Sequence, residues 1–237
     1  FYYSINEGNV DYNILNDLIQ TGGMQNLTYQ DAAAKLQIGG KYLQSGGTFN
    51  FHGSTGNTSL ADSVIVNGNF SQSNGVLRFD NAQGSLNMSQ NVVVLNSDSV
   101  LFSGNGVITH ANHLTTNTLF GKILYNKTGT SSFQRATSTH DLQQVEMVVG
   151  PLTTLDVKSS IQPLLIASHA SSSPAVNNVF TINGVLDMGL QRIMARQQGN
   201  YYSQLSVGST GKIKTMNPNG LYSISTASTI NTLIAGN

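Results

Sequence analysis

The sequence predicts an all-β fold, a parallel β-helix (β-solenoid) in which short strands stack coil upon coil. The clearest observation is the form of residues 180–188 and 205–215. In each of them, a short stretch of alternating apolar and polar residues runs into a glycine-containing turn and leaves as a second short strand. Strand, turn and strand repeated in this way are typical of the coils of a solenoid.

A recurring corner and its spacing support the same fold. Residues 66–70, Val-Asn-Gly-Asn-Phe, and residues 182–186, Ile-Asn-Gly-Val-Leu, share one order of apolar residue, turn and apolar residue, and residues 149–152 are a looser relative. The step from Ile182 to Val207 is 25 residues, inside the range of roughly 20 to 50 residues expected for stacked repeats. We therefore expect successive coils about 4.8 Å apart, paired in parallel ladders around apolar columns.

An antiparallel β-sandwich is the alternative architecture. Asn-Gly dipeptides supply positive φ at low cost and favour hairpins. Such dipeptides lie between the predicted strands at Asn67-Gly68, Asn74-Gly75, Asn183-Gly184 and Asn219-Gly220. Short, numerous strands fit either architecture, and the recurring corner favours the solenoid.

The first 45 residues differ from the rest and predict an N-terminal capping segment. A first short helix would begin after Asp11 and end at residues 22–23, with an apolar face of Ile14, Leu15, Leu18 and Ile19. A second would follow a capping box formed by Thr28 and Asp31 and end at residues 39–40. Two such helices would cover the open end of the solenoid, and an irregular loop is the alternative.

Residues 46–225 are predicted to form the body of the β-helix, and residues 226–237 a C-terminal tail. The body is divided by glycine turns into strands that are mostly shorter than eight residues. The expected strands cover residues 48–52, 63–70, 76–80, 85–89, 92–95, 100–102, 107–110, 119–125, 145–149, 154–157, 164–168, 179–188, 202–207 and 212–216.

Composition excludes several classes of partner and cofactor. Only 9% of the 237 residues are charged and the formal net charge is zero, so the basic surface that drives nucleic-acid binding is missing. The chain has no cysteine, which excludes disulfides and thiolate metal sites. Its longest apolar runs, such as residues 92–95 and 164–167, are far too short for a transmembrane helix. We expect no cofactor and no metal.

The second half of the chain carries a resemblance to a known group of proteins. Residues 179–189, followed by residues 205–221, resemble the repeat phrases of large secreted surface proteins of Bacteroidetes, and residues 120–129 are similar to their phrase in which an apolar strand leads to Asn and then to Gly. The resemblance implies a right-handed parallel β-helix and delivery to the cell surface or medium through the type IX secretion route. It also implies a function as an adhesin or as a component of the extracellular matrix. It also implies that the chain is part of a larger surface protein, and it supplies no catalytic residue.

The best enzymatic candidate in the sequence is a small charged set. Arg78 and Asp80 share one strand face, and Asp98 follows eighteen residues after Asp80, which could place it one coil above. Polysaccharide-processing β-helices use carboxylates and a basic residue on exposed strand faces. A surface ion pair is the more common meaning of such a set, so we expect no catalytic residues and keep these three as the alternative.

Other polar groups indicate surface residues rather than sites. His110 and His113 follow a strand, where a spacing of three sends side chains to opposite faces. Solvated turn residues are also the expectation for His140, Asp141 and Glu146. Threonines with irregular spacing and tyrosine pairs that could stack on sugars complete the set: Thr115, Thr116, Thr118, Thr153, Thr154, Tyr2, Tyr3, Tyr201 and Tyr202.

These observations predict a non-enzymatic, secreted or cell-surface β-helix module. Its nearly neutral surface of Asn, Ser, Thr and Gln suits weak, multivalent binding of glycans or other surface polymers through the lateral faces. A polysaccharide lyase or depolymerase is the alternative function.

Overall fold

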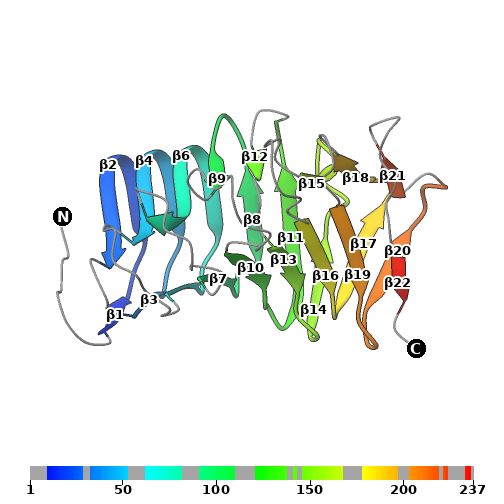
Figure 1. The fold of residues 1–237 in the computed structure, drawn as a ribbon, viewed down its shortest axis with the longest axis horizontal. Coiled ribbons are helices and arrows are strands. Elements are labelled where there is room, and N and C mark those ends of the chain that lie inside the picture. Colours follow the sequence, from blue (N-terminus) through cyan, green and yellow to red (C-terminus); the bar gives the residue numbers. More distant parts are fainter. Residues whose placement is uncertain are drawn as a thin grey trace.

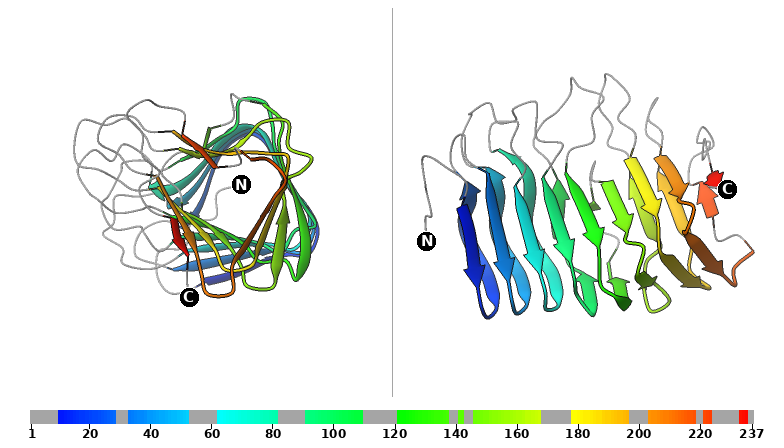
Figure 2. Two further views of the ribbon diagram at one scale, coloured as in Figure 1. Left: turned by 90° about the vertical axis from the view of Figure 1, so that its right-hand side faces the viewer. Right: turned by 90° about the horizontal axis from the view of Figure 1, so that it is seen from below.

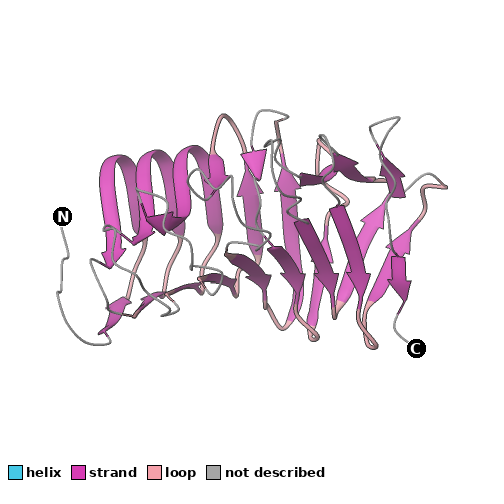
Figure 3. Ribbon diagram, in the orientation of Figure 1, coloured by secondary structure: helices cyan, strands magenta, loops and turns pink. Residues whose placement is uncertain are grey.

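The computed structural model contains twenty-two β-strands and, among the residues that it describes, no helix (Figure 3). The described residues are 10–28, 33–52, 62–81, 91–109, 121–137, 141–142, 146–167, 178–196, 203–218, 221–223 and 233–235. Every strand pair in the described residues is parallel, and the strands pair with equivalent strands of the neighbouring coils (Figures 1 and 2). The parallel β-helix is therefore confirmed, and the antiparallel sandwich is excluded.

The strands form three sheets that run along the solenoid axis. Sheet A contains one strand from each of nine coils: β1 (Val10–Ile14), β3 (Ala34–Ile38), β5 (Ser63–Val66), β7 (Val92–Leu95), β10 (Lys122–Tyr125), β13 (Glu146–Val149), β16 (Asn178–Ile182), β19 (Ser203–Val207) and β22 (Leu233–Ala235). Sheet B contains β2 (Leu18–Thr28), β4 (Tyr42–His52), β6 (Phe70–Asn81), β8 (Ser99–Phe102), β9 (Val107–Thr109), β11 (Gly129–Arg135), β12 (Asp141–Leu142), β14 (Thr153–Asp156), β17 (Val185–Gly189) and β20 (Lys212–Thr215). Sheet C contains β15 (Leu164–Ala167), β18 (Ile193–Arg196) and β21 (Leu221–Ser223).

Apolar columns fill the interior, as the alternating strands predict. Ile182 pairs with Val207 one coil later, which confirms the predicted step of 25 residues. Because side chains alternate between the two faces of a strand, the same inward position is apolar in successive coils. The main inner column of sheet A consists of Ile14, Ile38, Val66, Leu95, Tyr125, Val149, Ile182 and Val207.

Aromatic rings stack between neighbouring coils on the other side of the core. The rings of Tyr42 and Phe70 lie 5.0 Å apart and nearly parallel, and those of Phe51 and Phe79 lie 4.9 Å apart. All four side chains are buried. These contacts add specific packing to the burial of a large apolar area.

The predicted corner is also confirmed. Val66, Val149 and Ile182 occupy the same column of sheet A, and each precedes the turn into sheet B. Asparagines follow the column on three successive coils: the Asn96 amide donates to Asn67 Oδ1 (2.9 Å), and the Asn126 amide donates to Asn96 Oδ1 (3.4 Å). This exposed ladder of amides joins the coils at their corner.

The predicted helical cap is wrong. Residues 10–14 and 18–28 form β1 and β2, and residues 34–38 form β3, so this segment already builds the first coils. Ile14 and Leu18 pack against the core from two different strands, because the parallel ladder to β3 and β4 outweighs the weak local helical pattern. The predicted boundary between residues 45 and 46 falls inside β4, and the predicted tail contains β22, which pairs with β19.

The first coils share a distinctive bend. β2, β4 and β6 are 11, 11 and 12 residues long, and each turns around the solenoid as one strand. A buried glutamine lies just before each bend, and a glycine with positive φ lies three residues later; the glutamines are Gln20, Gln44 and Gln72, and the glycines are Gly23, Gly47 and Gly75. A Cβ atom on Gly47 would lie 2.5 Å from the backbone of the coil below, so the bend requires glycine there.

Candidate functional site

Of the three charged residues predicted as the enzymatic alternative, Asp98 lies apart from Arg78. Arg78 lies in β6, where it is in register with Asn50 one coil earlier and with Thr109 one coil later. Asp98 lies instead at the corner between β7 and β8, and its carboxylate is 2.8 Å from Lys127 Nζ. Asp98 is therefore not one coil above Arg78, because the coil at this point takes 31 residues and not about eighteen. Asp80 lies in β6, two residues after Arg78, with its side chain outside the described part.

Arg78 belongs to a polar column on the outer side of the long strands. Asn26, Asn50 and Arg78 are in register on β2, β4 and β6. The neighbouring side chains point into the core: Phe49 and Phe51 flank Asn50, and Leu77 and Phe79 flank Arg78. By the alternation of a strand, the three polar side chains face outward, one above another. We call Asn26, Asn50 and Arg78 the polar column.

The polar column contains two buried atoms without hydrogen-bond partners. Asn50 has no exposed surface, and its Nδ2 donates to Asn26 Oδ1 at 2.8 Å. Among the described residues, its Oδ1 atom accepts no hydrogen bond, and the Nε atom of Arg78 on the next coil donates none. Each unpaired buried group costs about 1–3 kcal/mol, so a partner at this place would stabilise the protein.

The chemistry of this pair defines what it can bind. Asn50 Oδ1 is an acceptor and Arg78 Nε is a donor. The two residues lie on neighbouring strands, and such strands are about 4.8 Å apart. A hydroxyl group can donate to the first and accept from the second at the same time. Arg78 is only half-buried, so it connects the buried pair to the surface and offers a positive charge to an acidic ligand. The column is suited to a polyhydroxylated or acidic molecule.

Interior hydrogen bonds hold the strands that carry the polar column. The Gln44 amide donates to Gln20 Oε1 at 3.2 Å, and the Gln72 amide donates to Gln44 Oε1 at 2.9 Å. Each amide also donates to a backbone carbonyl beyond the bend on the next coil; the acceptors are Thr48, Val76 and Val107. This buried glutamine ladder joins the first arm of each bent strand to the chain beyond the bend on the next coil, and so holds together the strands that carry the polar column.

The sequence interpretation found Arg78 and missed its two asparagine neighbours. A signal for them is present in the sequence: residues 20–26, 44–50 and 72–78 each begin with Gln, have Gly at the fourth position and end with a residue of the polar column. These segments start 24 and then 28 residues apart. Such a step matches the period of stacked coils. Aligning the three segments would have placed Asn26, Asn50 and Arg78 in one column.

Some of the other predicted surface residues lie in the described part of the chain, and the rest lie outside it. Glu146 lies in β13 and forms an ion pair with Lys122 at 3.5 Å, while the hydroxyl of buried Thr153 donates to the Tyr125 carbonyl at 3.1 Å. Thr154 stacks between Thr130 and Val185, so a continuous threonine face is not formed there. Asp141 lies in β12, with its side chain outside the description. The remaining residues lie outside the described part: His110, His113, His140, Thr115, Thr116, Thr118, Tyr2, Tyr3, Tyr201 and Tyr202.

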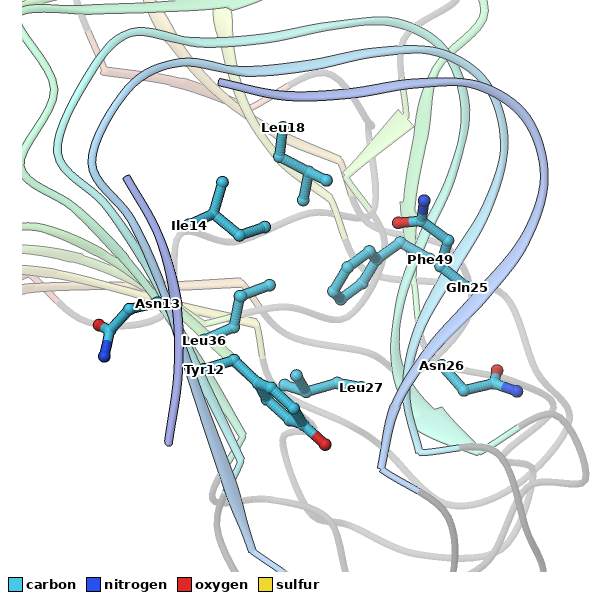
Figure 4. A pocket seen from close by; sticks show the side chains of 9 residues that line it. All are labelled: Tyr12, Asn13, Ile14, Leu18, Gln25, Asn26, Leu27, Leu36 and Phe49. Carbon is cyan, nitrogen blue, oxygen red and sulfur yellow. The ribbon is translucent and has the colours of Figure 1, made fainter. Parts of the chain in front are cut away.

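A second feature is a cavity of about 290 Å³ at the first coil. It is the open end of the solenoid interior, and the side chains of Ile14, Leu18, Leu36 and Phe49 point into it (Figure 4). Asn13 and Asn26 point away from it (Figure 4). The cavity is lined mainly by members of the inner columns, so its walls have the apolar character of the core.

Comparisons with known proteins identify no relative: no family, no curated protein and no solved structure matches this chain. In the part of the chain that the structure describes, no group of three or more His, Cys, Asp or Glu side chains could hold a metal ion. The described residues also include no helix that is long and apolar enough to span a membrane. The polar column and the open end are thus judged on their own chemistry.

Proposed function

We propose that this chain is a non-enzymatic module of a secreted or cell-surface protein, which binds glycans or similar surface polymers weakly and in many copies. The observation that carries this proposal is the polar column. Arg78 is the half-exposed member of the column, and its guanidinium suits a uronate or sulfate group at the surface, while the buried Asn50 holds its place beneath it in the column.

The form of the solenoid supports weak binding repeated along a surface. A lateral column offers one shallow contact for each chain, so useful retention comes from many copies acting together. The nearly neutral composition, with 9% charged residues, disfavours strong non-specific binding to polyanions. A surface setting also agrees with the resemblance of residues 179–189 and 205–221 to secreted repeat proteins.

The experiment that tests this proposal is binding of the chain to glycans, with Arg78→Met as the test variant. Methionine keeps much of the aliphatic stem and removes the donor. Native protein, displayed in many copies on beads, should be retained by at least one class of neutral or acidic polysaccharide. Arg78→Met should lower the apparent affinity at least about tenfold, because a hydrogen bond to a charged group contributes about 1.5–3 kcal/mol.

A matched control is Arg192→Met, which removes an exposed arginine from a later coil. It should bind as the native chain does. Retention that Arg78→Met leaves unchanged would place the binding face elsewhere, and an absence of retention on every polysaccharide would contradict the proposal. Release of oligosaccharide products by the native chain would show the polysaccharide-active enzyme instead.

A further inference from the structure

The bend of β6 carries an Asn-Gly pair, Asn74 and Gly75, in the middle of the long strand (Figure 1). Asn74 is exposed to solvent, and Gly75 has a φ of 86°. The ladder to β4 pairs Asn74 with Ser45 and then resumes at Val76. Among the described strands, Gly75 thus has no register partner on β4, β8 or β9. The backbone ladder is interrupted at this glycine.

The side chain of Asn74 occupies this gap in the ladder. The backbone N–H of Gly75 donates to Oδ1 of Asn74 at 2.8 Å. Because Oδ1 is bonded to Cγ, the same contact brings the Gly75 nitrogen close to the carbon of the side-chain amide. A nitrogen held in this way needs little further motion to reach the separation of roughly 3–3.5 Å from which a bond can form. Glycine also has no side chain that would block the approach.

A second Asn-Gly pair on the same coil is held differently. Asn67 is also exposed, but its Oδ1 accepts a hydrogen bond from the Asn96 amide at 2.9 Å. The N–H of Gly68 donates to the Gly40 carbonyl on the preceding coil at 2.8 Å. Both groups that would have to react with each other are therefore engaged with neighbouring coils. The two Asn-Gly pairs share their residue types and their exposure, and they differ in the partner of the glycine nitrogen.

From this contrast we infer that Asn74 is a site of spontaneous covalent modification, deamidation through a cyclic imide, and that Asn67 is protected from it. The Gly75 nitrogen loses its proton to hydroxide and forms a bond to Cγ of Asn74. The bond from Cγ to Nδ2 breaks, and Nδ2 takes a proton from water and leaves as ammonia, which regenerates the hydroxide. Water then opens the succinimide ring. Cleavage of the new bond at Cγ gives aspartate, and cleavage at the main-chain carbonyl of residue 74 gives isoaspartate.

The modification changes both charge and chain geometry at the bend. Either product places a carboxylate where the native chain has a neutral amide, in a chain whose formal net charge is zero. Isoaspartate also adds one carbon atom to the backbone of β6, two residues after Gln72. The Gln72 amide joins this strand to the Val107 carbonyl at 3.1 Å, so the longer backbone lies beside the buried glutamine ladder. The inference stands without any glycan binding.

The test is site-specific mass spectrometry of the folded chain during incubation at neutral and at mildly alkaline pH. Trypsin cuts after Lys41 and Arg78 and releases residues 42–78, a single peptide that contains both asparagines. Fragmentation of this peptide locates the modified residue and distinguishes aspartate from isoaspartate. Asn74 should deamidate at least about tenfold faster than Asn67, because only the Gly75 nitrogen is held against its own side-chain amide. Both rates should rise with pH, since the nitrogen reacts without its proton. Equal rates at the two residues, a faster reaction at Asn67, or no product at residue 74 overturns the inference.

Unfolding is the control that separates structure from local sequence. In guanidinium chloride both glycine nitrogens lose their folded-state partners, so the two rates should approach each other. A difference that persists unchanged in the unfolded chain would belong to the local sequence and would overturn the inference.

Asn74→Gln is the matched variant. It keeps a side-chain amide at this position, but the extra methylene requires a larger ring. Modification at residue 74 should therefore fall at least about tenfold, while Asn67 reacts as in the native chain. Thermal unfolding checks that the variant is folded. Modification of the glutamine as fast as that of Asn74 overturns the inference.

Discussion

The first three coils and the later coils differ in how the chain turns around the solenoid. In the first three, a single long strand, β2, β4 or β6, bends around the solenoid. From β8 onward the same path is divided into two shorter strands joined by a turn, as in β8 with β9 and β17 with β18. The inner column at the bend changes at the same place: it is glutamine at residues 20, 44 and 72, and then Phe102 and Arg135.

This change shows what a continuous bend requires. A strand that turns sharply directs backbone carbonyls toward the interior, where they need donors. The glutamine amides supply these donors and also pair with one another from coil to coil. Phe102 has no donor to offer, and there the strand ends after residue 102 and a new one begins at residue 107. The polar interior of the first coils is therefore part of their shape, whereas the later columns through Ile182 are apolar.

The largest effect is expected for a charge placed in the apolar columns of the later coils. Ile182 has no exposed surface and stacks between Val149 and Val207. Ile182→Lys would bury an unpaired ammonium and should lower the free energy of unfolding by several kcal/mol, enough to unfold the surrounding coils. Thr181→Lys, on the outer face of the same strand, is the matched control and should cost little. Equal thermal stabilities of the two variants would show that this column is not dry core.

A smaller but still large effect is expected within the glutamine ladder. Gln44→Leu leaves Gln20 Oε1 and the Val76 carbonyl without their donor, and removes the acceptor of the Gln72 amide. The loss should be about 2–4 kcal/mol in the free energy of unfolding, measured by urea denaturation. Gln134→Leu makes the same chemical change on the outer face of β11 and should alter stability by less than about 0.5 kcal/mol. Similar losses in both variants would mean that the ladder has no special role.

The architecture followed from the sequence because its signals are repeated in many coils. The step from Ile182 to Val207 and the corners at residues 66–70 and 182–186 fixed the register of sheet A, and the strand over residues 92–95 was placed with its observed bounds. The helices predicted within residues 10–38 are wrong because Ile14, Leu18 and Leu36 also fit a helical spacing, and the parallel ladder that decides between the two states is a long-range interaction. The local sequence pattern alone does not show whether this ladder forms.

The candidate site was only partly accessible for a related reason. The charge of Arg78 makes it a candidate, but its neighbours in space are distant in the sequence. Asn50 precedes it by 28 positions and Thr109 follows it by 31. Because the length of a coil varies along the chain, the sequence does not show this distance directly. The prediction that Asp98 lies one coil above Asp80 assumes too short a coil. The Gln-to-Gly spacing of residues 20–23, 44–47 and 72–75 carries the true register, and only a comparison of those segments with one another reveals it.

Stabilisation, by contrast, is expected from removing two core hydroxyls. Tyr42 and Tyr125 are buried in different parts of the solenoid, and neither hydroxyl has a hydrogen-bond partner in the part of the chain that the structure describes. Burial also raises the pKa of both phenols well above its usual range, so they remain neutral in the folded chain. Tyr42→Phe and Tyr125→Phe should each raise the free energy of unfolding by about 1 kcal/mol.

Tyr12→Phe is the control for this pair, because Tyr12 lies at the open end and is only half-buried. It should not raise the stability. A loss of stability in Tyr42→Phe or Tyr125→Phe would mean that the hydroxyl has a partner, such as an internal water, and would make the interior of that part of the solenoid more polar than its columns indicate.

The smallest effect is expected on the outer face of the later coils, at Lys158. Its Nζ lies 3.1 Å from Asp187 Oδ2 and 3.2 Å from Asp156 Oδ2. The hydrogen bonds to Asp187 and then to Asp156 raise the pKa of Lys158 above its usual value. Stability from a raised lysine pKa is fully present below the unfolded-state pKa and is lost as pH rises through the folded-state pKa. Lys158→Met keeps most of the stem, which packs against Gly189, and loses only the charge.

The melting temperatures of the native chain and Lys158→Met should therefore differ slightly, by a constant amount from about pH 6 to about pH 9, and should converge as pH rises past about 10.5. Added salt should reduce the difference at neutral pH, because the pair is exposed to solvent. A difference that persists unchanged to the highest pH would assign the effect to packing of the stem against Gly189. The outer face of the later coils would then be stabilised by apolar contact, as their interior is, and the contrast with the polar first coils would extend to the surface.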